Sequence, residues 1–209
     1  MCGKIFFGVG EKEILLEMKL IAITGGIGSG KSVVSTILRK LGYAVYDCDS
    51  RAKLLMATSA DIKRELAEAF GADVVAADGT ICAPRLAAKV FGDNEALMRL
   101  NGIVHPRVKQ DILRWAEGIA SSNVDCCECR VFVETAILHE SGLDAIVDEE
   151  WQVTAPEYVR VARVMKRNGI SEADVRRRIA SQSNYTAGIV IVNDGVTAIL
   201  PQIMMLMGQ

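Results

Sequence analysis

The sequence predicts an α/β fold in which a five-stranded parallel β-sheet is flanked by helices. Three observations support this prediction. Apolar runs typical of buried strands alternate with amphipathic helical segments along the chain. A glycine-rich loop joins the first such strand, 19–24, to the first helix, 31–41. At 209 residues, the chain is long enough for one such domain with a small insertion.

The glycine-rich loop is the run Gly-Gly-Ile-Gly-Ser-Gly-Lys-Ser at 25–32, which matches the P-loop pattern G-x-x-x-x-G-K-[ST]. Its glycines let the backbone turn N–H groups toward an anion, and the N-terminus of the next helix adds partial positive charge. In this pattern Lys31 reaches the β- and γ-phosphates, and the Ser32 hydroxyl binds Mg²⁺. The sequence therefore predicts a P-loop NTPase-type sheet that binds a nucleoside triphosphate.

The elements after the first helix follow from periodicity and from turn signals. Gly42 ends that helix, and 44–46 is the second strand. A helical stretch over 50–70 breaks near 58–59, and Asp78-Gly79 marks a turn. Further helices are expected over 84–91, 93–101 and 105–121, with Pro84 and Pro106 in first-turn positions.

The second half of the chain returns to alternating strands and helices. Strands are expected at 130–134, 149–154 and 189–192, although 149–154 is polar for a buried parallel strand. A helix runs from Pro156 to about 168 and ends at Gly169, and Ser171 begins the next with a capping-box pattern. The last helix is expected over 197–207.

These elements predict a single P-loop kinase domain over 18–209. The helical stretch between the second and third strands, about 50–121, is too long for one crossover and predicts a substrate-binding insertion. A helical lid is expected over about 156–183. Residues 1–17 are interpreted as a peripheral leader, with an upstream start-site artefact as the alternative.

Composition excludes several classes of function. The formal net charge of -2 gives no electrostatic reason to expect nucleic-acid or membrane binding. Of the six cysteines, Cys126 and Cys129 form a C-x-x-C pair, but the further ligands of a zinc site are missing. These cysteines are interpreted as reduced thiols, which indicates a cytoplasmic protein.

Two carboxylates, Asp47 and Asp49, follow the second strand, whose end the first crossover places beside the P-loop. A carboxylate there accepts a proton from an attacking hydroxyl or holds Mg²⁺ through water. The alternative is that Asp49 caps the following helix. With the P-loop present, the chemical role is favoured.

Basic residues and one histidine are further candidates. Arg160, Arg163 and Arg167 share one helix face, where cations stabilise the charge of a transferred phosphoryl group. Arg176-Arg-Arg178 is interpreted as a solvated face, and His105 before Pro106 as a capping or packed residue, with a catalytic residue as the alternative. The GTP-switch motifs N-K-x-D and D-x-x-G and the protein-kinase signatures are missing, which indicates a small-molecule kinase.

From residue 18 onward, the chain resembles the dephospho-CoA kinase family. The resemblance is carried by an ordered set of motifs: Ile23–Ser32, Val45–Asp49, Phe70-Gly71, Asp78-Gly79, Val90-Phe91, Leu100–Pro106, Glu134–Glu140, Gln182 and Val190–Asn193. It implies transfer of the γ-phosphoryl group of ATP to the ribose 3′-hydroxyl of dephospho-CoA, the last step of coenzyme A synthesis. Expected alternatives are another small-molecule or nucleoside-monophosphate kinase, or a non-catalytic ATP-binding copy.

The resemblance also implies residue roles. Asp49, Lys31 and Arg163 are expected to be catalytic, Asp49 and His105 to bind dephospho-CoA, and Ser32 to bind Mg²⁺. The residues expected to bind ATP are Gly26, Gly28, Ser29, Gly30, Lys31, Ser32, Val33, Arg167 and Asn193. Departures from the family pattern are Ala83 in place of an arginine, Ala136 in place of a proline, and a shortened segment after Gln182.

Overall fold

The structure, a computed structural model, describes residues 18–121, 130–182 and 188–208. The chain divides into two compact units. We call residues 1–46 together with 119–209 the sheet unit, and residues 47–118 the helical unit. The helical unit spans nearly the same residues as the substrate-binding insertion predicted over 50–121. The predicted leader and the C-x-x-C pair lie outside the described residues.

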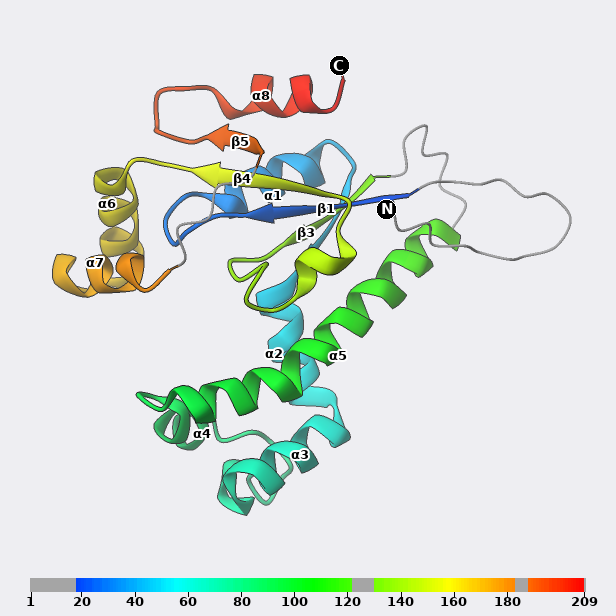
Figure 1. The fold of residues 1–209 in the computed structure, drawn as a ribbon, viewed down its shortest axis with the longest axis vertical. Helices are drawn as coiled ribbons and strands as arrows, with labels where there is room; N and C mark the ends of the chain where they lie inside the picture. Colours follow the sequence, from blue (N-terminus) through cyan, green and yellow to red (C-terminus); the bar gives the residue numbers. More distant parts are fainter. Residues whose placement is uncertain (1–17, 122–129, 183–187, 209) are drawn as a thin grey trace, which may run out of the picture. The chain divides into compact units, whose positions relative to one another are not determined.

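The sheet has five strands in the order β2-β3-β1-β4-β5 (Figure 1). They are β1 (Lys19–Thr24), β2 (Ala44–Asp47), β3 (Arg130–Glu134), β4 (Glu149–Thr154) and β5 (Ile189–Val192). β1 pairs in parallel with β3 and with β4, and β4 pairs in parallel with β5. The predicted parallel sheet and the positions of its strands are therefore confirmed.

One face of the sheet is covered by α1 (Lys31–Lys40) and α8 (Ile199–Leu206) (Figure 1). Alternate strand residues such as Ile21, Ile23 and Val153 point into a shared core with these helices. Phe132 and Trp151, both fully buried, pack with their rings tilted by 59° and their ring centroids 5.2 Å apart. This core fixes the end of β1, and with it the start of the P-loop.

The polar residues of β4 alternate with its buried ones. Trp151 and Val153 are buried in the core, whereas Glu150 and Gln152 are half-buried on the opposite face. Gln152 lines a pocket there. β4 is more polar than a typical buried parallel strand because the face that carries Glu150 and Gln152 is only half-buried, and Gln152 on that face lines a pocket.

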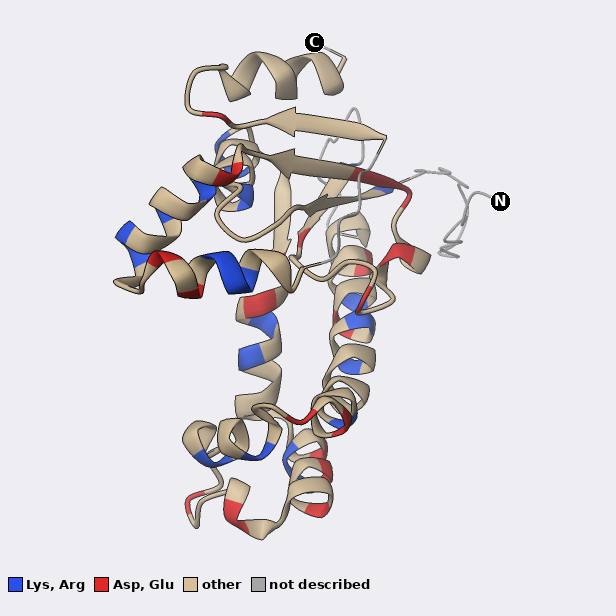
Figure 2. Ribbon diagram, turned by 60° about the vertical axis from the view of Figure 1, so that its left-hand side comes forward, with Lys and Arg blue, Asp and Glu red and all other residues tan. Residues whose placement is uncertain are grey.

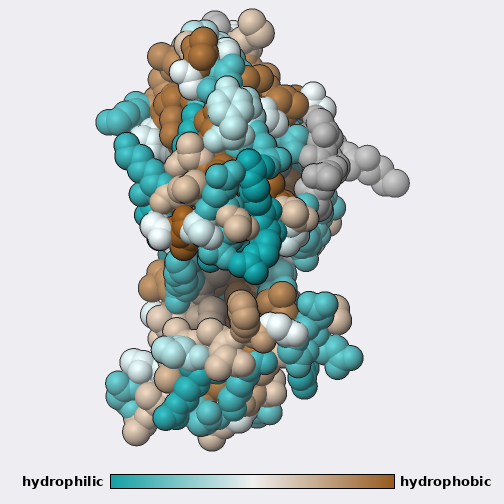
Figure 3. Space-filling model, turned by 90° about the vertical axis from the view of Figure 1, so that its left-hand side faces the viewer, coloured by the Kyte–Doolittle hydropathy of each residue, from teal (hydrophilic) through white to brown (hydrophobic). Residues whose placement is uncertain are grey.

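After β4 the chain forms a helical hairpin of α6 (Glu157–Asn168) and α7 (Glu172–Ala180). Gly169, at φ 65°, ends α6, and the Ser171 side chain accepts a hydrogen bond from the Asp174 N–H, so both predicted helix signals are confirmed. Arg176 pairs with Glu157 on α6, which joins the two helices, and with Glu172 on its own helix. Acidic and basic residues alternate along the hairpin (Figure 2), and its outer surface is mainly hydrophilic (Figure 3).

The helical unit consists of α2 (Cys48–Thr58), α3 (Ala60–Phe70), the 3₁₀ turn η1 (Ala72–Val74), α4 (Ala83–Val90) and most of α5 (Asn94–Ser121). Ile62, Leu66 and Leu86 lie in its core. Ser59 separates α2 from α3 and caps α3 through the Ile62 N–H, as the predicted break requires. Pro84 lies in the first turn of α4, as predicted.

The prediction of two helices over 93–101 and 105–121 is wrong, because α5 is continuous and contains Pro106. Proline removes one backbone hydrogen bond and disfavours a helix interior by about 3 kcal/mol. Val104, Val108 and Ile112 recur at helical spacing on the buried side. Their burial outweighs the local effect of the proline, since each such side chain contributes about 1.5–3 kcal/mol.

β5 forms one edge of the described sheet. The Gln202 side chain lies on this edge: its Oε1 accepts from the Val192 N–H at 2.8 Å, and its Nε2 donates to the Val192 carbonyl at 2.9 Å. Both main-chain groups of Val192 are thus satisfied by one amide.

In the described part of the chain, no helix combines the length and apolar composition of a membrane span.

Candidate active site

The P-loop backbone follows β1 and depends on three glycines with positive φ angles, Gly25, Gly28 and Gly30, at 141°, 78° and 98°. A Cβ atom on Gly25 would lie 2.3 Å from the Val153 carbonyl oxygen. A Cβ atom on Gly30 would lie 1.9 Å from the Asn193 amide nitrogen. The loop therefore tolerates no side chain at these positions, and it forms the backbone cradle that the motif predicts.

α1 begins at the end of this cradle. Gly30 is its N-cap residue and contributes no side-chain cap, so the first-turn N–H groups face the loop. The Lys31 ammonium lies over the loop and donates to the Gly25 carbonyl at 2.7 Å. Ser29 Oγ is buried and has no hydrogen-bond partner among the described residues. Loop, helix terminus and lysine together favour an anion.

Arg163 on α6 connects the P-loop to the end of β5. Its guanidinium donates to the Asn193 carbonyl at 3.0 Å and to Asn193 Oδ1 at 3.1 Å, and it lies 3.4 Å from the carbonyls of Gly28 and Ser29. Asn193 Nδ2 donates to the Ser29 carbonyl at 2.8 Å. Asn193 is buried, and both ends of its amide are used.

Arg160 lies on the same helix, and its Nε donates to the Ile27 carbonyl at 2.9 Å. Its Nη2 donates to Gln182 Oε1 at 3.1 Å. Burial lowers the pKa of Arg160, because its cation is partly removed from water. Arg167, the third residue of the predicted face, is exposed and donates to Asn168. Two of the three arginines thus contact the P-loop.

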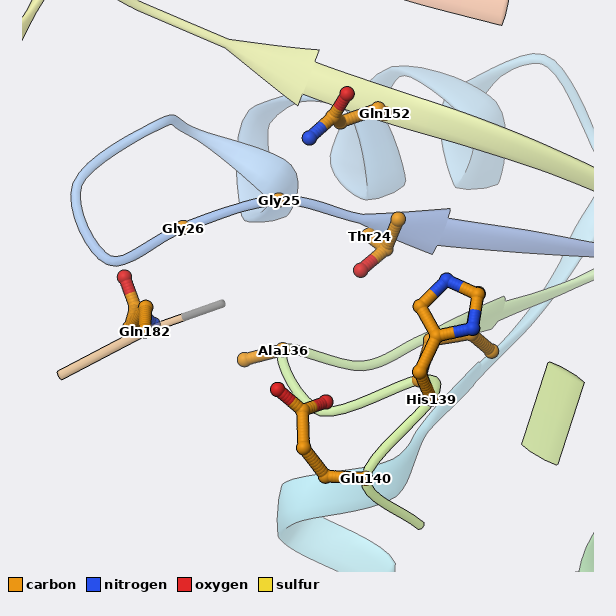
Figure 4. Close-up of a pocket in the computed structure, with 9 residues that line it drawn as sticks. Thr24, Gly25, Gly26, Ala136, His139, Glu140, Gln152 and Gln182 are labelled. Carbon is orange, nitrogen blue, oxygen red and sulfur yellow. The ribbon is translucent and has the colours of Figure 1, made fainter. Parts of the chain in front are cut away.

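A small pocket lies beside the P-loop at the ends of β1, β3 and β4 (Figure 4). Thr24, Gly25 and Gly26 form one side, and the loop after β3 contributes Ala136, His139 and Glu140, whose carboxylate points into the pocket. Ala136 therefore stands at the pocket wall, where the family pattern has proline. The position suits an acceptor group next to the phosphates.

His139 is placed between two carboxylates. Its Nδ1 lies 3.4 Å from Asp144 Oδ2, in the 3₁₀ turn η2 (Leu143–Ile146), and its Nε2 lies 3.5 Å from Glu150 Oε2 on β4. These contacts join the loop after β3 to β4. They fix the wall of the pocket.

Asp49 and His105 belong to the helical unit. The alternative that Asp49 caps α2 is wrong, because the cap is Asp47, which accepts from the N–H groups of Asp49 and Ser50. With Asp47 as the N-cap, α2 begins at Cys48, two residues earlier than expected, which leaves the Asp49 carboxylate exposed in the first turn. His105 is half-buried in α5, and burial lowers its pKa.

No cluster of three or more His, Cys, Asp or Glu side chains among the described residues could hold a metal. The Ser32 hydroxyl is exposed in the first turn of α1. A single hydroxyl suits Mg²⁺ only when phosphate oxygens and water complete the shell, which is how this cation is held with nucleotides. The residues therefore fit Mg²⁺ that arrives with a triphosphate.

The sequence does not identify Gln182 or Glu140 as site residues, although both lie in motif segments. The contact of Gln182 with Ile27 joins residues 155 positions apart. Periodicity places Arg160 on the correct helix face but does not distinguish it from Arg167. Only the fold separates the arginines that contact the loop from the one that does not.

Comparison with known proteins identifies similar chains over nearly the whole sequence. The dephospho-CoA kinase family model matches residues 19–198. A dephospho-CoA kinase of Porphyromonas gingivalis is 44% identical over 165 residues, covering 79% of this chain and 78% of the relative. One from Bacteroides fragilis is 39% identical over 189 residues, covering 88% and 89%.

Solved structures agree with this result. The structure of TT1252 from Thermus thermophilus has a TM-score of 0.73 and 32% identity, covering 91% of this chain and 95% of that one. A dephospho-CoA kinase from Campylobacter jejuni, at TM-score 0.62 and 20% identity, covers 90% and 95% and shares the fold. The architecture is thus that of the P-loop kinases.

Proposed function

Because this chain belongs to the dephospho-CoA kinase family, we propose that it transfers the γ-phosphoryl group of ATP to the ribose 3′-hydroxyl of dephospho-CoA. The products are coenzyme A and ADP. One observation carries the proposal: Lys31 and Arg163 both contact a P-loop whose glycines leave no room for side chains. A cytoplasmic location remains our expectation.

We assign the ATP phosphates to the P-loop, from Gly26 to Val33. The uncapped start of α1 and the glycine backbone offer N–H groups to the β- and γ-phosphates, and the buried Ser29 hydroxyl gains a partner there. Lys31 stabilises the charge that develops on the transferred group. Arg163 adds a second cation, and Asn193 orients it.

Mg²⁺ is assigned to the Ser32 hydroxyl together with phosphate oxygens. When bound, it neutralises charge on the β- and γ-phosphates. Arg167 is exposed on α6 near the end of the helix, and we retain it as an ATP ligand by family resemblance alone.

Asp49 is assigned as the residue that orients the 3′-hydroxyl and accepts its proton. Its exposed carboxylate is available for this role because Asp47 caps α2. His105 is assigned to dephospho-CoA binding; its lowered pKa keeps the imidazole neutral near pH 7, so that one ring nitrogen donates and the other accepts. Neither Asp49 nor His105 is among the residues that line the pocket beside β1.

The test is ADP release by the purified chain with Mg²⁺ and ATP, with and without dephospho-CoA. We expect strong stimulation by dephospho-CoA and the appearance of coenzyme A. Stimulation by a nucleoside monophosphate instead would make the chain a different small-molecule kinase. ATP binding without turnover on any acceptor would identify a non-catalytic copy, and the shortened segment after Gln182 would be the first region to restore.

A further inference from the structure

Ile27 occupies a variable position of the P-loop motif. Its N–H, its carbonyl and its side chain are all contacted by the α6–α7 hairpin or by Gln182, which lies just after α7. Its N–H donates to Gln182 Oε1 at 2.8 Å, and its carbonyl accepts from Arg160 Nε at 2.9 Å. Its side chain packs against the buried valines 161, 164 and 175. The hairpin thus fixes both the backbone and the side chain of one loop residue.

Gln182 has a central place in this arrangement because one oxygen atom serves two donors. Besides the Ile27 N–H, Gln182 Oε1 accepts from Arg160 Nη2 at 3.1 Å. The Arg160 guanidinium is half-buried, and a partly desolvated cation needs acceptors close by. Gln182 Oε1 and the Ile27 carbonyl supply them.

The fit of these groups against the loop is close. A Cβ atom on Gly26 would lie 2.3 Å from Arg160 Nη2 and 2.9 Å from Gln182 Oε1. In the close-up, the Gln182 amide points toward Gly26 (Figure 4). The amide and the guanidinium therefore lie directly against the backbone that cradles the phosphates.

We propose that Gln182 is a positioning residue for ATP: its amide oxygen holds the Ile27 backbone and the Arg160 guanidinium in the arrangement that receives the phosphates. This inference rests on the proposed binding of ATP at the P-loop. Gln182 touches neither ATP nor the acceptor in this role. It acts by ordering the loop before the nucleotide binds.

The expected consequence is a change in ATP affinity more than in the chemical step. A glycine-rich loop has high conformational entropy when it lacks contacts, and a ligand that must order it binds more weakly. Replacing Gln182 with methionine keeps the length and removes the acceptor. We expect the Kd and KM for ATP to rise about tenfold, which is typical for loss of a hydrogen bond that involves a charged group. The kcat and the KM for dephospho-CoA should change less than about threefold.

The experiment compares wild type with Gln182→Met, Arg160→Met and the double variant. Calorimetry measures the Kd for ATP with Mg²⁺ and no acceptor, and steady-state kinetics measure both KM values. Arg176→Met is the matched control, because Arg176 on α7 pairs with Glu157 on α6 and with Glu172 on its own helix, and neither pair includes a P-loop residue. It should loosen the hairpin and leave the Kd for ATP within about twofold, as expected of exposed ion pairs.

Support requires weaker ATP binding in Gln182→Met and a smaller effect of that substitution when Arg160 is already methionine, since the two residues share one contact. An unchanged Kd in folded Gln182→Met overturns the inference. If Gln182→Met does not fold, the Kd for ATP of Arg160→Met is the test instead. An unchanged Kd for ATP in that variant also overturns the inference. If wild type binds ATP but does not phosphorylate dephospho-CoA, the proposed function fails, while the calorimetric comparison still tests the inference.

Discussion

Replacing Gly30 with alanine tests how closely the P-loop packs against the end of β5. Gly30 has a φ of 98°, and a Cβ atom there would lie 1.9 Å from Asn193 Nδ2. No real Cβ contact is that short, so Asn193 must move. The Asn193 amide is buried and donates to the Ser29 carbonyl at 2.8 Å, so its movement breaks that bond.

Two effects contribute to the expected loss of stability. Left-handed backbone disfavours an L-residue by roughly 1–2 kcal/mol. Leaving the Ser29 carbonyl and the Asn193 amide without partners costs about 1–3 kcal/mol more. Together they lower the free energy of unfolding by about 2–5 kcal/mol, which corresponds to a fall of roughly 4–20 °C in Tm for a chain of this length.

Gly42→Ala provides the matched control. Gly42 has a similar φ of 92°, and a Cβ atom there would meet nothing within 4 Å. Only the backbone effect remains, so its Tm should fall by about 2–8 °C, less than that of Gly30→Ala. The difference between the two variants isolates the contact with Asn193.

Differential scanning calorimetry of Gly30→Ala, Asn193→Ala and the double variant completes the test. In the Asn193→Ala background the clash is gone, so adding Gly30→Ala should lower Tm only as far as Gly42→Ala does in wild type. Equal Tm values for Gly30→Ala and Gly42→Ala would refute the packing argument. So would an effect of Gly30→Ala that is the same with and without Asn193.

Three further predictions concern activity and pH. Lys31→Ala should lower kcat by about 10²–10³-fold by removing positive charge at the transferred phosphoryl group, and a near-normal kcat in the ADP-release assay would exclude this role. Asp49→Asn should keep the wild-type Kd for ATP in calorimetry but lower kcat by about 10²–10⁴-fold, whereas an unchanged kcat would show that no proton passes to this residue. Burial lowers the pKa of His105 from its ordinary value of 6.5, so the unfolded chain binds the extra proton first and stability should fall as pH drops below about 6.5. Urea unfolding at pH 5 and pH 8 should show a smaller pH dependence for His105→Asn than for wild type; equal dependence would assign the effect to other groups.

The parts of the fold that follow local rules were predicted from the sequence. The strands, the P-loop, the break at Ser59, and the helix signals Gly169 and Ser171 each depend on a few neighbouring residues. Pro106 shows where local rules fail: its preference for a helix start is overcome by apolar contacts of the whole helix α5. Burial at Val104 and Val108 depends on residues distant in sequence, which the local pattern does not contain.

The candidate site shows the same division. Lys31 and Ser32 lie within one motif, and their place at the start of α1 follows from it. The sequence suggests Asp49 as the possible cap of the next helix, and only the backbone geometry shows that Asp47 accepts the N–H groups. The contacts of Ile27 with Arg160 and Gln182 require the assembled sheet unit, because they join segments more than 130 residues apart.

The amide of Gln202 on β5 has a consequence for how copies of this chain meet in solution. An edge strand with unpaired N–H and C=O groups is a template for adding a strand from another molecule, which leads to aggregation. Val190 and Val192 are about two-fifths exposed, at 40% and 37%, so this edge carries the apolar side chains that favour such pairing. The Gln202 amide makes the two hydrogen bonds to the main chain of Val192 that a neighbouring strand would otherwise make. A single side chain from α8 thus makes these two groups of the edge strand unavailable to a strand of another molecule.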